Sequence, residues 1–137
     1  MKMTQTSGLL ALVLLLPAAT VLAHHGTATS YDQKKLVKVE GVVKEFHWRN
    51  PHAGLFLTGK DESGKDVTYS LEMGSPFVLS NLGFSRNTFK PGDKVVAEMH
   101  PSYGSPTSGE LFSGRVSVNG KAVSIKPGAP TTEEYTK

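Results

Sequence analysis

The chain has 137 residues and no cysteine, with 15 lysines and arginines, 12 aspartates and glutamates and a formal net charge of +3. The lack of cysteine excludes disulfides, a cysteine nucleophile and the cysteine that anchors bacterial lipoproteins. Basic and acidic side chains are interspersed along the sequence. Because nucleic-acid-binding proteins usually cluster their lysines and arginines on one face, this balance argues against a nucleic acid as the partner.

Residues 1–23 have the pattern of a cleavable secretory signal peptide. A basic start at Lys2 is followed by the apolar run 8–16 and by a small-residue stretch that ends at Ala23. The apolar run is shorter than the roughly 20 residues that cross a bilayer. We therefore predict cleavage after Ala23, a periplasmic or secreted bacterial protein, and no stable membrane insertion after processing.

The remainder is long enough for one compact domain with one hydrophobic core. Residues 24–35 are a polar N-terminal segment, and residues 36–126 carry the alternating patterns of β-strands. Residues 127–137 are expected to be a disordered tail. We therefore expect one β-rich domain between two polar ends.

Three strands are predicted in the first half of this domain. Residues 36–46 form a long strand, in which Gly41 is expected to mark a bulge or a sharp bend. Residues 53–60 and 65–73 should pair as a hairpin across the turn at 61–64.

A short helix should follow these strands, because Ser75 and Pro76 form a typical helix start and Gly83 a typical helix end. Two further strands are predicted at 94–99 and 111–118. A short strand at 123–125 would complete a hairpin at Asn119-Gly120.

This order of elements predicts an OB-fold-like Greek-key β-barrel, which has a helix between its third and fourth strands. A small β-sandwich is the alternative, since the same strands could form one. In an OB-fold the loop between strands one and two and the loop between strands four and five border the ligand surface. The residues of these two loops are therefore the first candidates for function.

The two loops contain unusual residues. The first spans 47–52 and the second 100–110. Four residues in them are candidate contacts for an organic ligand, namely Trp48, Arg49, Asn50 and Tyr103. The two aromatic rings could form a stacking platform for a sugar or a base, although a lone tryptophan in a small barrel is more often part of the core. Arg49 could hold an anion or be an ordinary surface charge.

Histidines suggest a second hypothesis, a copper or zinc site, because imidazole is a good ligand for both metals. The candidate ligands are His24, His25, His47, His52 and His100. Cleavage after Ala23 would free an α-amino group beside the imidazole of His24, and the two nitrogens could chelate copper. Alternatively, the first two histidines belong to a flexible terminus, His47 and His52 to a rigid corner around Pro51, and His100 to the surface.

The mature chain resembles a family of small exported bacterial proteins classified only as a domain of unknown function. The features that carry the resemblance are Ala23-His24-His25, Gly41-Val42-Val43 with Phe46 and Trp48, Asn50-Pro51-His52, Leu71-Glu72 with Ser75-Pro76, and Pro91-Gly92-Asp93. The resemblance implies an exported single-domain β protein and brings no activity with it.

No catalytic motif is present, whether a nucleophile elbow, a phosphate-binding loop or a zinc-protease helix pattern. We therefore predict a binding module rather than an enzyme. Two functions remain open at this point: capture of copper or zinc through the histidines, or binding of an unknown envelope component, glycan, peptide or protein partner.

Overall fold

The computed structural model describes residues 29–123, apart from the side chains of residues 112–114. The predicted signal peptide at 1–23, the histidines His24 and His25, and the predicted tail at 127–137 lie outside the described residues. The architecture below therefore concerns the predicted barrel and the last part of the polar N-terminal segment.

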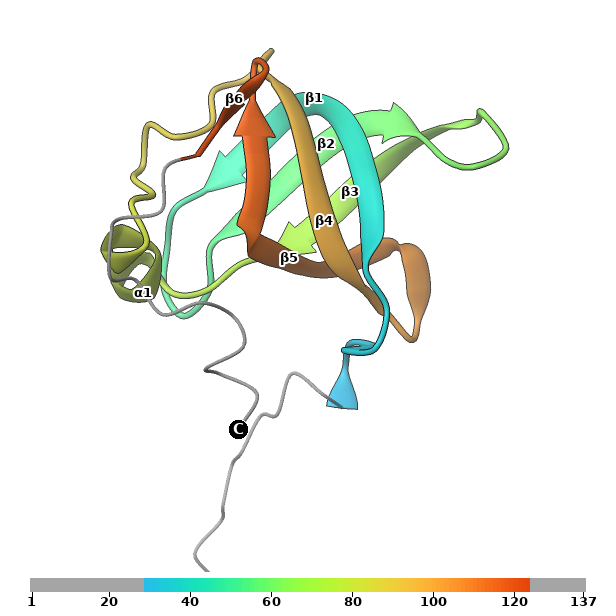
Figure 1. Ribbon diagram of the computed structural model, residues 1–137, viewed down its shortest axis with the longest axis horizontal. Coiled ribbons are helices and arrows are strands. Elements are labelled where there is room, and N and C mark those ends of the chain that lie inside the picture. Colours follow the sequence, from blue (N-terminus) through green and yellow to red (C-terminus); the bar gives the residue numbers. More distant parts are fainter. Residues whose placement is uncertain (1–28, 124–137) are drawn as a thin grey trace, which may run out of the picture.

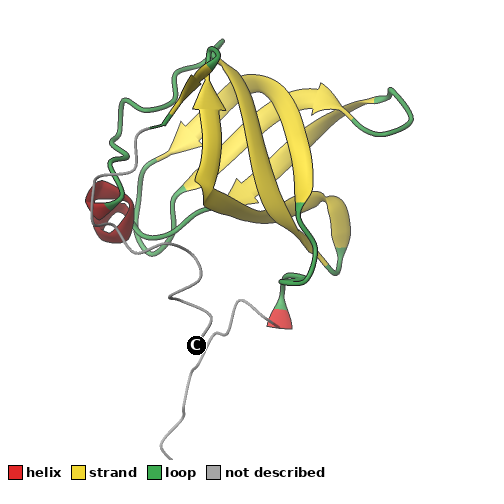
Figure 2. Ribbon diagram, viewed as in Figure 1, coloured by secondary structure: helices red, strands yellow, loops and turns green. Residues whose placement is uncertain are grey.

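Six strands and one short helix make up the described part of the chain (Figures 1 and 2). In chain order they are β1 (Val37–His47), β2 (Gly54–Lys60), β3 (Asp66–Glu72), α1 (Pro76–Asn81), β4 (Lys94–Ser102), β5 (Ser105–Val118) and β6 (Lys121–Ala122). The predicted order of elements is confirmed.

The strands form one sheet in the order β3-β2-β1-β4-β5-β6, and a parallel pairing between β3 and β5 closes it. This closure joins Ser70, Leu71 and Glu72 to residues 108–110. A closed five-stranded barrel with this connectivity is OB-fold-like, which confirms the predicted fold. The sandwich alternative is wrong, because the strands belong to one closed sheet rather than to two stacked ones.

Strand β1 bends and pairs with a different strand on each side of the barrel. Its first half pairs with β4 and its second half with β2, and Gly41 lies opposite both Val95 and Gly59. A Cβ atom on Gly41 would lie 2.7 Å from the carbonyl oxygen of Thr58, so only glycine fits this close crossing. The bulge itself lies farther along, between Val43 and Glu45. Gly41 therefore marks the close crossing rather than the bulge.

The barrel interior is filled by side chains that alternate along the strands, as period-two patterning requires. Leu55, Leu57 and Leu71 are fully buried, and Leu79 of α1 packs into the same cluster. Ser75 caps α1 by accepting a hydrogen bond from the backbone nitrogen of Val78. The short helix predicted from its capping residues is present, and it covers one end of the barrel through Leu79.

The last two strands differ in extent from the prediction. Strand β5 begins at Ser105, six residues before the predicted start, and the final strand is β6 at 121–122 rather than 123–125. Residues 105–110 contain three hydroxyl side chains, one proline and one glycine, and they lack an apolar pattern. They become a strand because β4 pairs with them on one side and β3 on the other. The predicted turn is present, with Asn119 and Gly120 both at positive φ.

Candidate functional site

Two of the hollows on the described part of the barrel contain candidate residues, and these two share no lining residue. The larger, which we call the mouth groove, lies between the β2–β3 turn, the start of β1 and the β4–β5 turn. The smaller, which we call the histidine pocket, lies beside the β1–β2 loop. Each contains residues that the sequence had singled out, so each is considered in turn.

The mouth groove has a volume of about 1040 Å³. It lies away from α1, which the ribbon views place on the other side of the barrel from the β2–β3 turn (Figure 1). Its lining comes from four segments: Asp32, Lys35, Val37, Lys38 and Glu40; Lys60–Ser63; Tyr69; and Pro101–Thr107. The barrel therefore has one end plugged by a helix and another that is open to a ligand.

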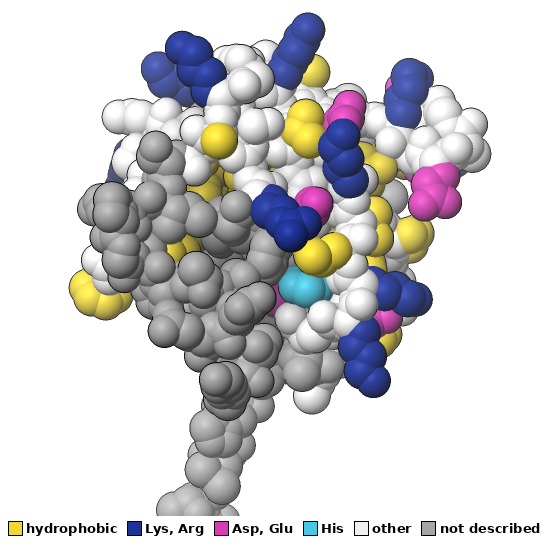
Figure 3. All heavy atoms as spheres, in the orientation of Figure 1, with side chains coloured by type: hydrophobic (Ala, Val, Ile, Leu, Met, Phe, Trp, Pro, Cys, Tyr) yellow, Lys and Arg dark blue, Asp and Glu magenta, His cyan; other side chains and the backbone are white. Residues whose placement is uncertain are grey.

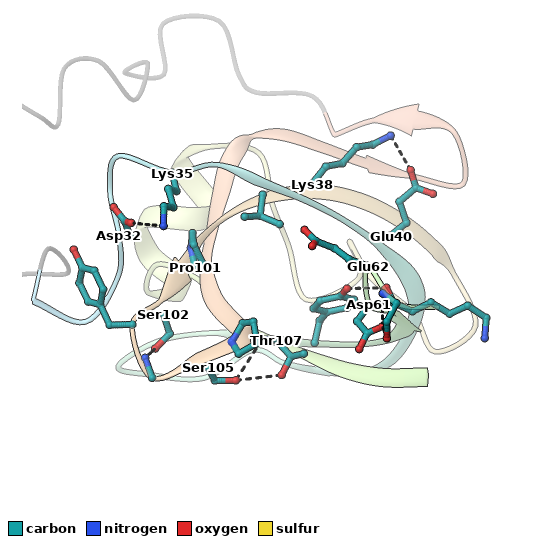
Figure 4. A pocket seen from close by; sticks show the side chains of 17 residues that line it. Asp32, Lys35, Lys38, Glu40, Asp61, Glu62, Pro101, Ser102, Ser105 and Thr107 are labelled. Atoms are coloured by element: carbon teal, nitrogen blue, oxygen red, sulfur yellow. Dashed lines mark hydrogen bonds and ion pairs between the residues drawn. The ribbon is translucent and has the colours of Figure 1, made fainter. Parts of the chain in front are cut away.

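Charges around the mouth groove are nearly balanced, with three lysines against four acidic side chains. Lys38 contacts Glu40 at 2.7 Å and Lys35 contacts Asp32 at 3.4 Å, as Figure 4 shows. Lys60 contacts Asp66 at 2.7 Å. Because every lysine of the groove has a carboxylate partner, the groove offers no unpaired cation to a polyanionic ligand.

Hydroxyl groups and two tyrosines supply the rest of the polar lining. Tyr103 is 66% exposed on the β4–β5 turn, so its ring is available for stacking. Tyr69 is buried, and its hydroxyl donates to the carbonyl of Lys60 at 2.8 Å. Burial raises the pKa of Tyr69 above its ordinary value. Ser105 and Thr107 contact each other at 3.2 Å on the β5 wall (Figure 4).

The histidine pocket has a volume of about 200 Å³ and lies where β1 ends and β2 begins. His47 and His52 both line it, and each uses one ring nitrogen on a carboxylate. His52 Nδ1 lies 2.7 Å from Glu72 Oε1, and His47 Nε2 lies 2.9 Å from Glu45 Oε2. Both imidazoles are thus oriented by acidic neighbours that the sequence alone could not assign.

Glu72 is in turn held by the N-terminal segment. Its Oε2 accepts a hydrogen bond from the hydroxyl of Tyr31 at 2.8 Å. Burial, and next the hydrogen bond to Glu72, raise the pKa of Tyr31 far above its ordinary value. Tyr31 also bridges to Ser102 at the β4–β5 turn. Residues near the start of the described chain therefore connect the two loop regions.

The remaining lining of the histidine pocket is mixed in character. Arg49 is exposed and has no ion-pair partner among the described residues. The ring of Phe56 packs beside His47, with centroids 5.0 Å apart. The pocket thus combines two imidazoles, one guanidinium, one aromatic wall and the Glu72 carboxylate.

The structure separates the residues that the sequence assigned to one surface. His47, Arg49 and His52 share the histidine pocket, whereas Tyr103 lines the mouth groove. Trp48 packs against the core beside Phe46, at a ring distance of 5.8 Å, which favours its role in the core. The β1–β2 loop and the β4–β5 turn thus line different hollows.

Two other candidates lie outside both hollows. His100 Nδ1 lies 2.7 Å from the backbone carbonyl of Lys35, so this histidine fastens the N-terminal segment to β4. Asn50 precedes Pro51 in the β1–β2 loop, through a cis peptide bond, and is exposed. Neither residue lines a pocket described here.

Sequence reasoning missed Tyr31 and Gln33, which dock the polar N-terminal segment onto the barrel. Gln33 donates from its Nε2 to Glu110 Oε2 at 2.9 Å, and Tyr31 bonds Glu72. Glu72 and Glu110 are neighbours in the parallel β3–β5 pairing. No local signal could have found these contacts, because they join residues 41 and 77 positions apart.

Within residues 29–123, no group of three or more histidine, aspartate or glutamate side chains is arranged to hold a metal ion. The only helix in that part of the chain is too short to span a membrane. The described barrel therefore offers at most two histidines to a metal at one place.

Comparison with protein families gives a match. The model of a family described as "Family of unknown function (DUF6152)" covers residues 12–110. The chain belongs to this family. The family resemblance predicted from the Asn-Pro-His and related motifs is thereby confirmed at the level of the family. No curated protein and no solved structure matches the chain. Membership of DUF6152 carries no activity, so the function has to be argued from the residues.

Proposed function

We propose that this DUF6152 protein is an exported, non-enzymatic binding module that holds a neutral, hydroxyl-rich ligand, such as an envelope glycan, in the mouth groove. The observation that carries the proposal is the open end of the barrel, where an exposed tyrosine and several hydroxyls surround a large groove whose lysines each contact a carboxylate. OB-folds commonly bind oligosaccharides or oligonucleotides, and the mouths of β-barrels are frequent ligand sites.

Charge favours the glycan over the oligonucleotide. A nucleic-acid site needs unpaired lysines and arginines to neutralise phosphates. In the mouth groove, Lys35, Lys38 and Lys60 each contact a carboxylate. On the face shown in Figure 3, basic side chains are likewise scattered among acidic and neutral ones. A neutral ligand avoids the repulsion that these carboxylates would exert on phosphates.

The size and chemistry of the groove also favour an oligomeric polar ligand. Its volume lies just above the roughly 300–1,000 Å³ typical of small-molecule sites. Tyr103 offers a ring for stacking, and Ser63, Ser102 and Ser105 offer hydroxyls. A sugar presents an apolar ring face and many hydroxyls, so it matches this combination. Export is part of the proposal because the signal-like residues 1–23 would deliver the protein to the compartment that holds such polymers.

The test is binding of soluble chitotetraose and of peptidoglycan-derived muropeptides to the processed protein, followed by amide chemical shifts in NMR. We expect shifts at the β4–β5 turn and at the β2–β3 turn. Replacing Tyr103 by alanine should weaken binding about 10-fold, since stacking on an aromatic ring is worth roughly 1–3 kcal/mol. Its side chain is 66% exposed, so the fold should be unaffected.

The matched control is Phe77→Ala. Phe77 is 76% exposed, lies on α1 and lines neither hollow. Its loss should leave affinity unchanged. Equal affinities of wild type and Tyr103→Ala, or shifts confined to residues outside the groove, would contradict the proposal. Mass spectrometry of the exported protein tests the predicted N-terminus at His24, and an intact residue 1–23 segment would refute the export component.

A further inference from the structure

The histidine pocket carries an inference that does not depend on the mouth groove. We propose that His47 and His52 form a two-imidazole copper(II) site, oriented by Glu45 and Glu72. The proposal narrows the sequence hypothesis of a five-histidine copper or zinc site to two residues and one metal. Its basis is the hydrogen-bonding state of the two rings and their shared pocket.

The first argument is position. His47 ends β1, and His52 lies just before β2, which begins at Gly54. Both side chains line the same pocket of about 200 Å³, which is large enough for a hydrated ion. His100 does not line it, and its ring is fastened to the Lys35 carbonyl. Of the three described histidines, His47 and His52 therefore line one pocket together.

The second argument is which nitrogen of each imidazole ring contacts a carboxylate. A histidine that binds a metal almost always donates its other N–H to a carboxylate or carbonyl, which fixes the tautomer and the orientation. His52 Nδ1 lies 2.7 Å from Glu72 Oε1, and His47 Nε2 lies 2.9 Å from Glu45 Oε2. The second nitrogen of each ring, His52 Nε2 and His47 Nδ1, has no hydrogen-bond partner among the described residues. In the neutral ring that nitrogen carries the lone pair that a metal needs.

The third argument is that Glu72 is itself held in place by a hydrogen bond. Its other oxygen accepts from Tyr31, so the carboxylate that orients His52 is itself fixed. Preorganised outer partners of this kind raise metal affinity because less ordering has to accompany binding.

The number of ligands selects copper. Structural zinc sites use four protein ligands and catalytic ones three, whereas no group of three potential ligands converges within residues 29–123. Copper(II) binds nitrogen ligands more strongly than any other divalent ion of the first transition row, so it can use a site with two imidazoles and solvent. Arg49 lines the pocket and its positive charge opposes a cation, which limits the affinity.

The experiment is a titration of the isotope-labelled, processed protein with copper(II), read by paramagnetic broadening of backbone amide signals in NMR. We expect the earliest losses at the amides of Gly54, Phe56 and Ser70, which line the pocket. His47→Gln and His52→Gln should each weaken copper at least 10-fold and abolish this local broadening. His100→Gln is the matched control and should leave the broadening unchanged. Losses confined to other parts of the chain, or losses at the pocket that persist in both variants, would overturn the proposal.

Two further variants separate a metal site from an anion site, because the same pocket contains Arg49. Glu72→Gln keeps the side-chain shape but removes the charge behind His52, and should weaken copper about 10- to 100-fold. Arg49→Gln should tighten copper, since it removes a repulsive charge. Weaker copper binding by Arg49→Gln, or tighter binding of zinc than of copper by the wild type, would refute the copper assignment. The mouth-groove variant Tyr103→Ala should bind copper normally, so failure of one proposal can be distinguished from failure of the other.

Discussion

Replacing Gly41 by alanine should destabilise the barrel at its tightest strand crossing. A Cβ atom there would lie 2.7 Å from the carbonyl oxygen of Thr58 and 3.0 Å from the Cβ of Leu57. The carbonyl belongs to the paired backbone of β2. Relief therefore requires β1 and β2 to separate, and no side chain can simply rotate away.

The magnitude follows from two opposing effects. Overpacking of a well-packed interior typically costs about 1–3 kcal/mol. Alanine also restricts the unfolded chain, which offsets about 0.4–1 kcal/mol. The net loss should be on the order of 1–2 kcal/mol, and in a domain of this size that lowers Tm by about 5–15 °C.

Thermal unfolding followed by far-ultraviolet circular dichroism measures the effect, with Gly104→Ala as the control. Neither glycine has a left-handed φ, but a Cβ on Gly104 would have only the Ser102 hydroxyl oxygen nearby, at 3.8 Å. The control should therefore unfold at the wild-type temperature or slightly above it. If both variants shared the wild-type Tm, the explanation of Gly41 as a crowding site would be wrong.

Two further changes test the hydrogen bonds that tie distant segments together. The pKa of Tyr31 is raised by burial and by Glu72, so the unfolded chain releases this proton near pH 10 while the folded state retains it. The free energy of unfolding should therefore fall as pH rises above about 10. In urea unfolding between pH 8 and 11, Tyr31→Phe should lose less of this free energy than the wild type. Equal losses in the two proteins would contradict this. Asn119→Gly keeps the positive φ but removes bonds to Lys94 and Asp93. The side chain of Asn119 lowers the pKa of Asp93, so the variant should unfold at a lower urea concentration than the wild type at pH 7. The difference between the two urea midpoints should shrink below about pH 4. A difference that stays constant with pH would argue against the Asp93 contribution.

Local signals in the sequence were sufficient for most of the fold. Ser75 and Gly83 bracket the helix region because capping depends on neighbouring residues. Asn119-Gly120 specifies its turn through positive φ at both positions. The alternation of apolar residues predicted β1 to β4, and the element order predicted the OB-like barrel. These features depend on spacing within one element or between successive ones.

The arrangement of the candidate sites depends on contacts that spacing does not encode. Residues 105–110 lack a strand pattern and form a strand because the barrel closes around them. The partners of His52 lie 20 and more positions away in sequence, at Glu72 and, through it, at Tyr31. The sequence therefore indicated which residue types to consider, but it could not show that His47 and His52 share a pocket or that Tyr103 belongs to a separate groove.

Glu72 contacts both a histidine of one proposed site and the segment beside the other. One oxygen of this carboxylate holds His52, and the other holds Tyr31, whose neighbour Asp32 lines the mouth groove. A ligand that displaces the segment around Tyr31 would release one side of Glu72 and alter the affinity of His52 for a metal. Reciprocity of binding free energies then requires the metal to change the affinity of that ligand by the same factor. Through this one glutamate, the affinity of the barrel for each ligand would depend on whether the other ligand is bound.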